Sequence, residues 1–378
     1  MSGSSKNIET VAIHGSMKHY SGAKSIVPPI EMSTNFEHSK LGRQESDFIY
    51  TRHSNPNREQ LEQVLSELEG GEACCAFSSG MAAICAVLQV AGRGAHIIVP
   101  QDVYHGTRTA LVNFSNDWGI ECSFVDMTNT DAIENNIREN TALIYAETPS
   151  NPLIKITDLE AVNRICKANH IEFCVDNTWP TPYNLNPIEF GADLVVHSTT
   201  KYLAGHSDII GGAVIIADKK KHYEKLRIMQ SIQGAIPSAQ DCWLLSRSIR
   251  SFPYRMRAHN ENAKRVAEFL VNHPKVSEVF YPGLKTHQGH EIARKQMRGF
   301  GGMISFLIDG TEDDTLKVVA SSKMIARATS LGGVESIWEH RKSTEGENSN
   351  SLYNLIRLSV GLEHVDDIIQ DIEIALDS

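Results

Sequence analysis

The chain has 378 residues, of which 41% are hydrophobic and 22% charged, a balance that excludes disordered and fibrous classes and leaves room for two or three domains. Asp and Glu (46) outnumber Lys and Arg (36), and the resulting net charge of −10 argues against nucleic acid as a partner. No apolar run is long enough to cross a membrane, and the polar start MSGSSKNIET lacks the layout of a signal peptide. We therefore expect a soluble cytoplasmic protein without a membrane partner, whose seven cysteines, none in a CxxC pair, are reduced.

The first segment of the chain, residues 1–50, shows neither a helical nor a strand period, and a pair of adjacent prolines interrupts it. It is predicted to be an arm rather than a domain. Helices are then predicted over residues 57–69 and 80–90, the first of which ends at a pair of glycines.

Short apolar runs alternate with helical stretches after residue 90. These runs are AHIIVP, CSFVD, ALIYAE, IEFCVD, DLVVHST and GGAVIIAD. Strands that are apolar on both faces and alternate with helices indicate a mostly parallel sheet covered by helices. We expect one large α/β domain over residues 51–240 and a smaller α/β domain over residues 241–378.

Polar side chains follow three of these predicted strands, at the sheet edge where open parallel sheets bind their ligands. Asp176 ends one strand, Glu147 and Asn151 follow another in AETPSNP, and Lys201 follows a third in HSTTKY. A lone lysine at a sheet rim usually extends its amine to water. A lysine kept at a buried edge needs a partner or a chemical purpose, because burying its charge is costly.

Lys201 has neighbours that suit a particular cofactor. Ser198 and Thr200 share one face of the extended segment and offer two hydroxyl groups to an anion. The segment FSSGMAAICAVL places small residues at a helix start, where free N–H groups and the helix dipole favour a phosphate. An amine, a carboxylate such as Asp176 and a phosphate cup are the contacts that pyridoxal 5'-phosphate requires. The amine binds the cofactor covalently, the acid keeps the pyridine nitrogen protonated, and the cup anchors the phosphate.

Six motifs together resemble a known family: SSGMAA, ETPSNP, VDNTW, HSTTKYLAGHSDIIGG, SLGGVES and RLSVGLE. The chain is similar to the Cys/Met-metabolism family of pyridoxal-phosphate enzymes, from TVAIHG near its start to VGLEHVDDII near its end. That family includes cystathionine γ-synthase, cystathionine γ-lyase, cystathionine β-lyase and methionine γ-lyase. The resemblance implies a type I aminotransferase-like α/β fold, with a mostly parallel central sheet and a smaller C-terminal α/β domain. It also implies pyridoxal 5'-phosphate as the cofactor, and no metal is expected because the sixteen histidines show no HExxH or paired ligand spacing.

The resemblance implies roles for residues around the cofactor. Lys201 would bind it covalently and then move the proton on the substrate Cα, while Asp176 would pair with the pyridine nitrogen. Tyr104 would stack on the ring and help to move protons, and Asn151 would lie near the phenolic oxygen. The phosphate would be held by the backbone N–H groups of Gly80 and Met81 and by Ser198 and Thr200.

Further residues are implied to bind the substrate or a neighbouring subunit. Strand alternation in LIRLSVG puts Arg357 on the face opposite its apolar neighbours, where a guanidinium would bind the substrate carboxylate, assisted by Ser330 and Asn151. Tyr50 and Arg52 match the family's pair that reaches the phosphate of a neighbouring subunit. The resemblance thus implies a homotetramer of two dimers with shared active sites.

The chain departs from the usual family pattern at several places that affect substrate choice. Thr329 stands where a Glu usually precedes SLGG, YHGTRT replaces a run that starts YGGT, and IWEHRKSTEGENSNSLYN replaces a segment with methionine and histidine.

The expected reaction is elimination or replacement at the γ (or β) carbon of a sulfur amino acid, with cystathionine as the substrate and γ-cleavage favoured. Methionine γ-lyase and cystathionine β-lyase are alternatives, and an inactive regulatory homologue or a transaminase are alternatives of other classes. The polar groups expected at the far end of the substrate are His105, Arg108, Thr329 and Glu335.

Overall fold

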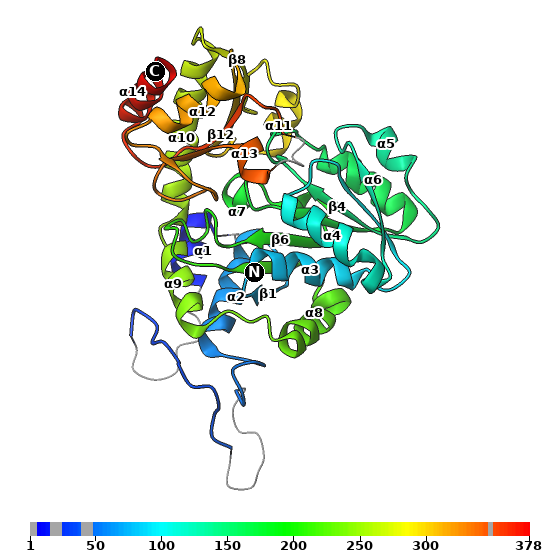
Figure 1. The fold of residues 1–378 in the computed structure, drawn as a ribbon. Helices are drawn as coiled ribbons and strands as arrows, with labels where there is room; N and C mark the ends of the chain where they lie inside the picture. The colour runs from blue at the N-terminus through cyan, green and yellow to red at the C-terminus, as the bar shows by residue number, and fades with distance from the viewer. Residues whose placement is uncertain (1–5, 16–24, 39–47, 347–350) are drawn as a thin grey trace.

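Two sheets, each with its own helices, make up the computed structural model, which describes residues 6–15, 25–38, 48–346 and 351–378 (Figure 1). The larger sheet has seven strands in the order β1-β7-β6-β5-β4-β2-β3. The smaller sheet has five strands in the order β10-β11-β12-β9-β8, and Figure 1 shows it above the larger one. This architecture confirms the predicted α/β class with a second, smaller sheet.

The larger sheet is mostly parallel, as predicted. Strands β3, β2, β4, β5 and β6 run parallel, whereas β7 is antiparallel both to β6 and to β1. The strand β1 adds to the predicted set; its five residues are buried on both faces and show no alternation that would have indicated it. The seven strands are β1 (Ala73–Phe77), β2 (His96–Pro100), β3 (Glu121–Val125), β4 (Thr141–Glu147), β5 (Glu172–Asp176), β6 (Leu194–Ser198) and β7 (Gly212–Ile216).

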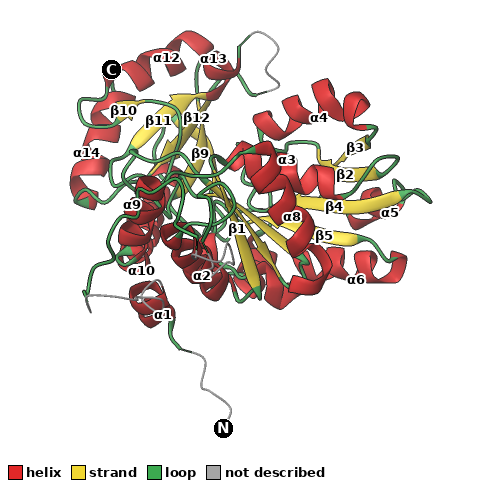
Figure 2. Ribbon diagram, turned by 90° about the horizontal axis from the view of Figure 1, so that it is seen from below, coloured by secondary structure: helices red, strands yellow, loops and turns green. Residues whose placement is uncertain are grey.

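Helices cover both faces of this sheet. Along β4, Leu143 and Tyr145 pack in one hydrophobic cluster, and Ile144 and Ala146 pack in the other, on the opposite face. Helices α3, α4 and α8 contribute to the first cluster, and α2, α6 and α9 contribute to the second. Figure 2 shows α3 and α4 on one side of β4 and β5, with α6 on the other side. The six helices are α2 (Pro56–Glu69), α3 (Gly80–Val90), α4 (His105–Trp118), α6 (Leu159–Asn169), α8 (Lys219–Gln233) and α9 (Ala239–Ile249).

The smaller sheet buries one face against three helices and turns the other toward the larger sheet. On β12, Ile356 and Leu358 pack in a third cluster with side chains of these helices, whereas Arg357 between them lines a cavity between the sheets. The strands are β8 (Val276–Phe280), β9 (Met303–Ile308), β10 (Ala326–Arg327), β11 (Ile337–His340) and β12 (Leu355–Ser359). The helices are α10 (Phe252–Val271), α12 (Glu312–Ser321) and α14 (Val365–Leu376).

The remaining elements are short. They are α1 (Ile8–His14), α5 (Thr130–Glu134), α7 (Thr181–Asn184), a 3₁₀ turn (Pro187–Phe190), α11 (His290–Gln296) and α13 (Arg341–Glu345). Residues 1–5, 16–24 and 39–47 of the predicted arm lie outside the described residues, and its described part includes α1, which contacts α2.

All seven cysteines are free. Within the described ranges, no helix is long and apolar enough to cross a lipid bilayer.

Candidate active site

A cavity of about 480 Å³ lies between the two sheets, beyond the carboxyl ends of β4, β5 and β6. This is the position at which an open parallel sheet binds ligands. Every residue predicted to bind the cofactor or the substrate α-carboxylate lines this cavity, except Tyr50 and Arg52. The predicted residues found there are Gly80, Met81, Tyr104, Asn151, Asp176, Ser198, Thr200, Lys201, Ser330 and Arg357.

Lys201 extends from the turn after β6 into the cavity, where its Nζ donates to the Ser330 Oγ at 2.7 Å. The pKa of the Lys201 amine is lowered to about 8, mainly by burial and also by the nearby Arg357 charge, while Glu339 opposes part of the shift. A substantial fraction of the amine is therefore neutral near physiological pH. A neutral amine can attack a carbonyl or accept a proton.

Asp176 is oriented by two donors. The Tyr145 hydroxyl donates to its Oδ2 at 2.8 Å, and the backbone N–H of Thr178 donates to its Oδ1 at 3.0 Å. Burial raises the pKa of Tyr145 well above its ordinary value, with the charge of Asp176 adding to the effect, so the phenol keeps the proton that it donates. The carboxylate therefore has a fixed direction.

Glu147, at the end of the neighbouring strand, also lines the cavity. Its Oε2 accepts a hydrogen bond from the backbone N–H of Tyr104 at 2.8 Å, which fixes the start of α4 against β4. Burial raises the pKa of the Glu147 carboxyl, and the adjacent Asp176 charge raises it further. The Tyr104 side chain is 42% exposed at the cavity wall.

Small residues and hydroxyl groups form an anion cradle where α3 begins. The Ser79 side chain caps the helix by accepting from the Ala82 N–H at 3.1 Å, and the N–H groups of a first helical turn have no partner within the helix. A side chain on Gly80 would place its Cβ 2.8 Å from the Ser198 Cβ, so glycine permits this close approach of α3 to β6. Thr200 accepts from the Gly211 N–H at 3.0 Å. Together these groups fit a phosphate.

Arg357 is held between the two sheets. Its Nη1 donates to the Asn151 Oδ1 at 3.0 Å, and its Nη2 donates to the Ser330 carbonyl oxygen at 3.0 Å and pairs with Glu339. Its Cζ lies 6.0 Å from the centre of the Trp179 ring. Ser330 has a φ of 88°, a strained backbone conformation for a residue other than glycine, which these contacts hold in place.

Tyr50 and Arg52 lie away from this cavity within the chain. The Arg52 Nη1 donates to the Ser231 carbonyl oxygen at 3.0 Å, and its Cζ lies 5.5 Å from the centre of the Tyr50 ring. Tyr50 is 40% exposed. Their predicted contact with a neighbouring subunit stays a prediction.

Of the four polar residues expected at the far end of the substrate, His105 and Thr329 line the cavity. Arg108 instead packs over the Phe124 ring, 4.1 Å from its centre, and Glu335 accepts from the Ser207 hydroxyl. Sequence reasoning missed several lining residues. Trp179 could have been found from the VDNTW motif, but Arg341 and Thr344 lie in the segment that departs from the usual pattern, where nothing indicated a role.

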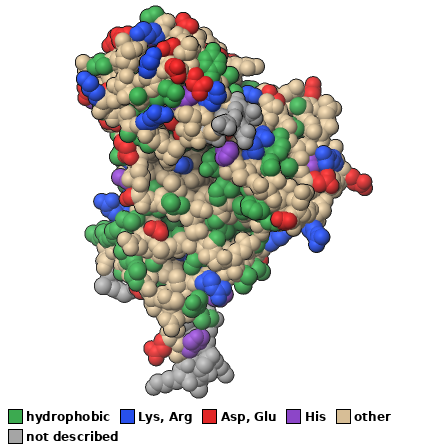
Figure 3. Space-filling view, in the orientation of Figure 1, with side chains coloured by type: hydrophobic (Ala, Val, Ile, Leu, Met, Phe, Trp, Pro, Cys, Tyr) green, Lys and Arg blue, Asp and Glu red, His purple; other side chains and the backbone are tan. Residues whose placement is uncertain are grey.

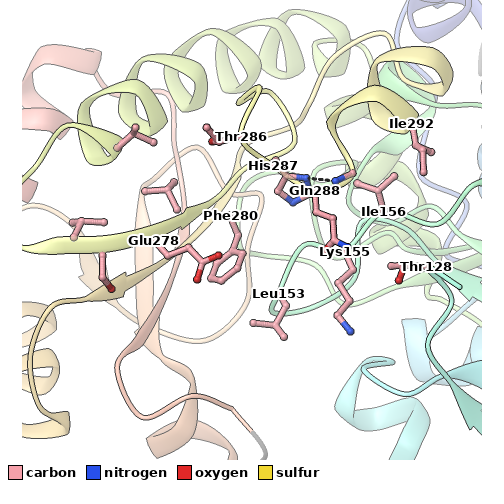
Figure 4. A pocket seen from close by; sticks show the side chains of 15 residues that line it. Thr128, Leu153, Lys155, Ile156, Glu278, Phe280, Thr286, His287, Gln288 and Ile292 are labelled. Carbon is pink, nitrogen blue, oxygen red and sulfur yellow. Dashed lines mark hydrogen bonds between the residues drawn. The ribbon is translucent and has the colours of Figure 1, made fainter.

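A second cavity, of about 510 Å³, lies between β8, α11 and the loop after β4 (Figure 4). Lys155 is the one amine and Glu278 the one carboxylate among the described residues that line it, and Figure 4 shows them on different walls. The Lys155 Nζ lies 3.5 Å from Asp126, and the His287 Nδ1 accepts from the Gly289 N–H at 3.1 Å. This cavity contains an amine, but it does not combine that amine with an oriented carboxylate and an anion cradle as the first cavity does.

The first cavity combines the three groups that pyridoxal 5'-phosphate needs, namely the Lys201 amine, the oriented Asp176 carboxylate and the cradle at Gly80. Fold and cavity together define the class of pyridoxal-phosphate-dependent enzymes. The chain belongs to the Cys/Met metabolism PLP-dependent enzyme family, whose model matches residues 9–377. The resemblance predicted from the sequence is confirmed, and the cofactor is pyridoxal 5'-phosphate.

Relatives of the chain include enzymes with different reactions. The chain is 42% identical to a cystathionine gamma-lyase of Bacillus subtilis, an alignment that covers 98% of this chain and 99% of the relative. It is 41% identical to a cystathionine beta-lyase of Lactococcus lactis subsp. cremoris, with the same coverage. Among solved structures, a cystathionine gamma synthase from Xanthomonas oryzae pv. oryzae in complex with aminoacrylate and cysteine superimposes with a TM-score of 0.94 at 35% identity, covering 98% of both chains.

The lowered pKa of Lys201 leads to a prediction for the cofactor-free protein. Only the neutral amine condenses with the cofactor aldehyde, so the rate of recombination with pyridoxal 5'-phosphate is expected to rise with pH, with a midpoint of about 8. Stopped-flow absorbance across roughly pH 6.5 to 11.5, a range that includes both the lowered and the ordinary lysine pKa values, measures this rate. A midpoint near 10.5, the ordinary lysine value, would contradict the described environment.

Proposed function

We propose that the protein catalyses elimination or replacement at the γ (or β) carbon of a sulfur amino acid, with cystathionine as the substrate. The observation that carries this proposal is the meeting of Lys201, Asp176 and Arg357 in one cavity of a chain that belongs to this family. When bound, pyridoxal 5'-phosphate withdraws electrons from the substrate Cα and makes its proton acidic. The remaining tasks are binding, orientation and proton transfer by the chain's own residues.

Lys201 moves the proton at the substrate Cα. Its pKa of about 8 lets the amine accept a proton and return it near neutral pH. Ser330 steadies the amine through their hydrogen bond of 2.7 Å. The Lys201 side chain is long and flexible, so its amine can take a proton from one carbon of the substrate and deliver it to another atom of the same substrate.

The cofactor-holding residues have separate tasks. Asp176, oriented by Tyr145 and Thr178, would keep the pyridine nitrogen protonated. Tyr104 at the start of α4 would stack on the cofactor ring, and Asn151 would contact its phenolic oxygen. The backbone of Gly80 and Met81 and the hydroxyl groups of Ser198 and Thr200 would hold the phosphate.

Arg357 binds the α-carboxylate of the substrate. A planar guanidinium suits a carboxylate because it can donate two parallel hydrogen bonds. Asn151 and the Ser330 carbonyl oxygen hold the guanidinium in place at 3.0 Å each.

The free cysteines support a reducing, cytoplasmic compartment for this enzyme.

Product analysis tests this function. The purified holoenzyme is offered cystathionine, methionine, or an activated homoserine ester with cysteine. We expect cystathionine to give cysteine, 2-oxobutanoate and ammonia, with a higher kcat/KM than methionine. Pyruvate with homocysteine as the main products would support a β-lyase, and a preference for methionine would support a methionine γ-lyase. Exchange of the amino group without ammonia, or no turnover at all, would contradict the proposal.

We further propose that the enzyme is a homotetramer of two dimers, in which residues 1–50 act as an arm and Tyr50 and Arg52 complete a neighbour's phosphate site. Exposed apolar side chains on the larger domain support self-association, since Ile210, Ile228 and Ile232 are each at least 60% exposed. Figure 3 shows apolar side chains gathered on the face of the larger domain below the smaller one. Ile210 also lines the cavity, so this exposed apolar surface includes a residue at the mouth of the cavity.

Hybrid subunits test the shared site. Arg52→Ala and Lys201→Ala chains are each expected to be nearly inactive alone. Mixing and refolding them is expected to restore activity, because a hybrid dimer contains one site with both residues intact. Turnover of the mixture is compared with that of each parent. A fully active monomer in light scattering, or no recovery on mixing, would contradict shared sites.

A further inference from the structure

A buried carboxylate, that of Glu69, contacts the ends of two strands that carry cavity residues. Glu69 is the last residue of α2 and is 1% exposed. Its Oε1 accepts a hydrogen bond from the Asn177 Nδ2 at 2.6 Å and pairs with the His197 Nε2, and its Oε2 accepts from the Asn186 Nδ2 at 3.2 Å. Glu69 is not among the described residues that line the cavity. Burying a carboxylate is costly even when it is paired, so its place next to the site calls for a reason.

Two partners of Glu69 are chain neighbours of residues in the cavity wall. Asn177 directly follows Asp176 at the end of β5. His197 directly precedes Ser198 at the end of β6. Successive side chains of an extended chain point to opposite sides, so the partners reach Glu69 while Asp176 and Ser198 line the cavity. Glu69 therefore holds, from outside the cavity, both of the strand ends that carry these two residues.

Further hydrogen bonds join the same two strand ends to each other. The Asn177 N–H donates to the Val196 carbonyl oxygen at 3.0 Å, and the Ser198 N–H donates to the Thr178 Oγ1 at 2.9 Å. The Thr178 N–H in turn donates to the Asp176 Oδ1 at 3.0 Å. One connected group of contacts thus sets both the direction of the Asp176 carboxylate and the place of Ser198.

Within this group, β6 depends on Glu69 more than β5 does. The His197 Nδ1 has no hydrogen-bond partner among the described residues, so the contact with Glu69 is the polar contact that orients the ring. The Asn177 Nδ2 has a second partner, the Leu185 carbonyl oxygen at 2.9 Å. Without the Glu69 charge, the end of β6 would loosen more than the end of β5, and the two cavity residues would lose their fixed separation.

We infer that Glu69 is a positioning residue for the cofactor. It fixes the Ser198 hydroxyl, which contacts the phosphate, relative to the Asp176 carboxylate, which contacts the pyridine nitrogen. The cofactor is a rigid ring with a short phosphate arm, so it can contact both residues only when their separation is right. Loss of the Glu69 charge would weaken the binding of the phosphate in particular, because the ring could still bind at Asp176. This inference rests on the part of the proposed function that assigns these contacts to Asp176 and Ser198.

Two forms of the cofactor that differ only in the phosphate group test the inference. Each full-length protein is prepared with pyridoxal 5'-phosphate or with pyridoxal bound, and the fluorescence of the bound form on dilution gives two dissociation constants. Their ratio measures the preference for the phosphate. We expect Glu69→Gln, which keeps the shape of the side chain but removes its charge, to lower this preference about three- to tenfold, as for one neutral hydrogen bond.

The matched control is Asp371→Asn, which removes the charge of another buried carboxylate. Asp371 belongs to α14 of the smaller domain, where it accepts from the backbone N–H groups of Lys323 and Ile325. This variant is expected to unfold at a lower temperature than the wild type and to keep its preference for the phosphate. A wild-type preference in Glu69→Gln, or an equal loss in Asp371→Asn, would overturn the inference, because Glu69 would then contribute to stability alone.

A second variant decides the question if Glu69→Gln does not fold. Asn177→Ala removes one of the two strand contacts of Glu69 and is expected to lower the preference for the phosphate in the same direction, and an unchanged preference would overturn the inference. Product analysis of the wild type is a separate measurement. A loss of preference in Glu69→Gln, together with no keto acid from any sulfur amino acid, would overturn the proposed reaction and leave this inference standing.

Discussion

Replacement of Lys201 by alanine is expected to abolish turnover and leave the fold intact. On the proposed mechanism, the variant would lose both the covalent attachment of the cofactor and the group that moves the Cα proton. General acid and base catalysis alone contributes about a hundred- to ten-thousandfold, so kcat with cystathionine should fall at least that far. The side chain makes one described hydrogen bond, to Ser330, so circular dichroism should show little change in secondary structure.

A surface lysine provides the control for that substitution. Lys317 pairs with Asp314 on the exposed face of α12 and is not among the cavity-lining residues, so Lys317→Ala should retain the parent kcat. If Lys201→Ala turned over near the parent rate with cofactor in excess, the assignment of the cavity as the active site would be wrong.

Asp176→Asn is expected to lower kcat by about ten- to a hundredfold, even at saturating cofactor. Asparagine has the same shape but no negative charge, so it stabilises a protonated pyridine nitrogen less well, and a charged hydrogen bond contributes roughly 1.5–3 kcal/mol. Steady-state kinetics with cystathionine at increasing cofactor concentration separates this effect from weak cofactor binding.

Tyr145→Phe is the matched control for the Asp176 variant. It removes the donor that orients the Asp176 Oδ2 at 2.8 Å but keeps the negative charge that acts on the pyridine nitrogen, so its effect on kcat should be smaller than that of Asp176→Asn, about tenfold or less. An Asp176→Asn enzyme with full activity would show that the carboxylate does not act on the cofactor. A Tyr145→Phe effect larger than that of Asp176→Asn would point to the phenol instead.

Much of the larger sheet could be predicted because its strands carry their own signal. The runs that form β4 and β5 are apolar on both faces and are separated by a helix, which is the pattern of parallel strands in a covered sheet. The strands β1 and β11 carry less signal. Strand β11 has only four residues, and the pairing of β1 with β7 depends on a segment distant in sequence. Helix α1 is seven residues long and gains its stability from packing against α2, which its own sequence does not reveal.

The cavity could be predicted in part for a similar reason. Asp176 and Lys201 stand at the ends of strands, so topology alone brings them together at one edge of the sheet. Arg341 joins them only through the packing of the smaller sheet onto the larger one and through Glu339, a strand residue without a distinctive motif. The proposed role of Tyr50 and Arg52 depends on a second subunit, so it stays a prediction.

The central claim is that Lys201 binds the cofactor in the cavity between the sheets, and chemical trapping tests it most directly. Borohydride reduction of the holoenzyme fixes the cofactor on the lysine that holds it, and peptide mass spectrometry then locates the added group. We predict that the label is found on Lys201 and that the Lys201→Ala protein carries none. A label on another lysine, such as Lys155 in the second cavity, or an unlabelled Lys201 in active enzyme, would contradict this account.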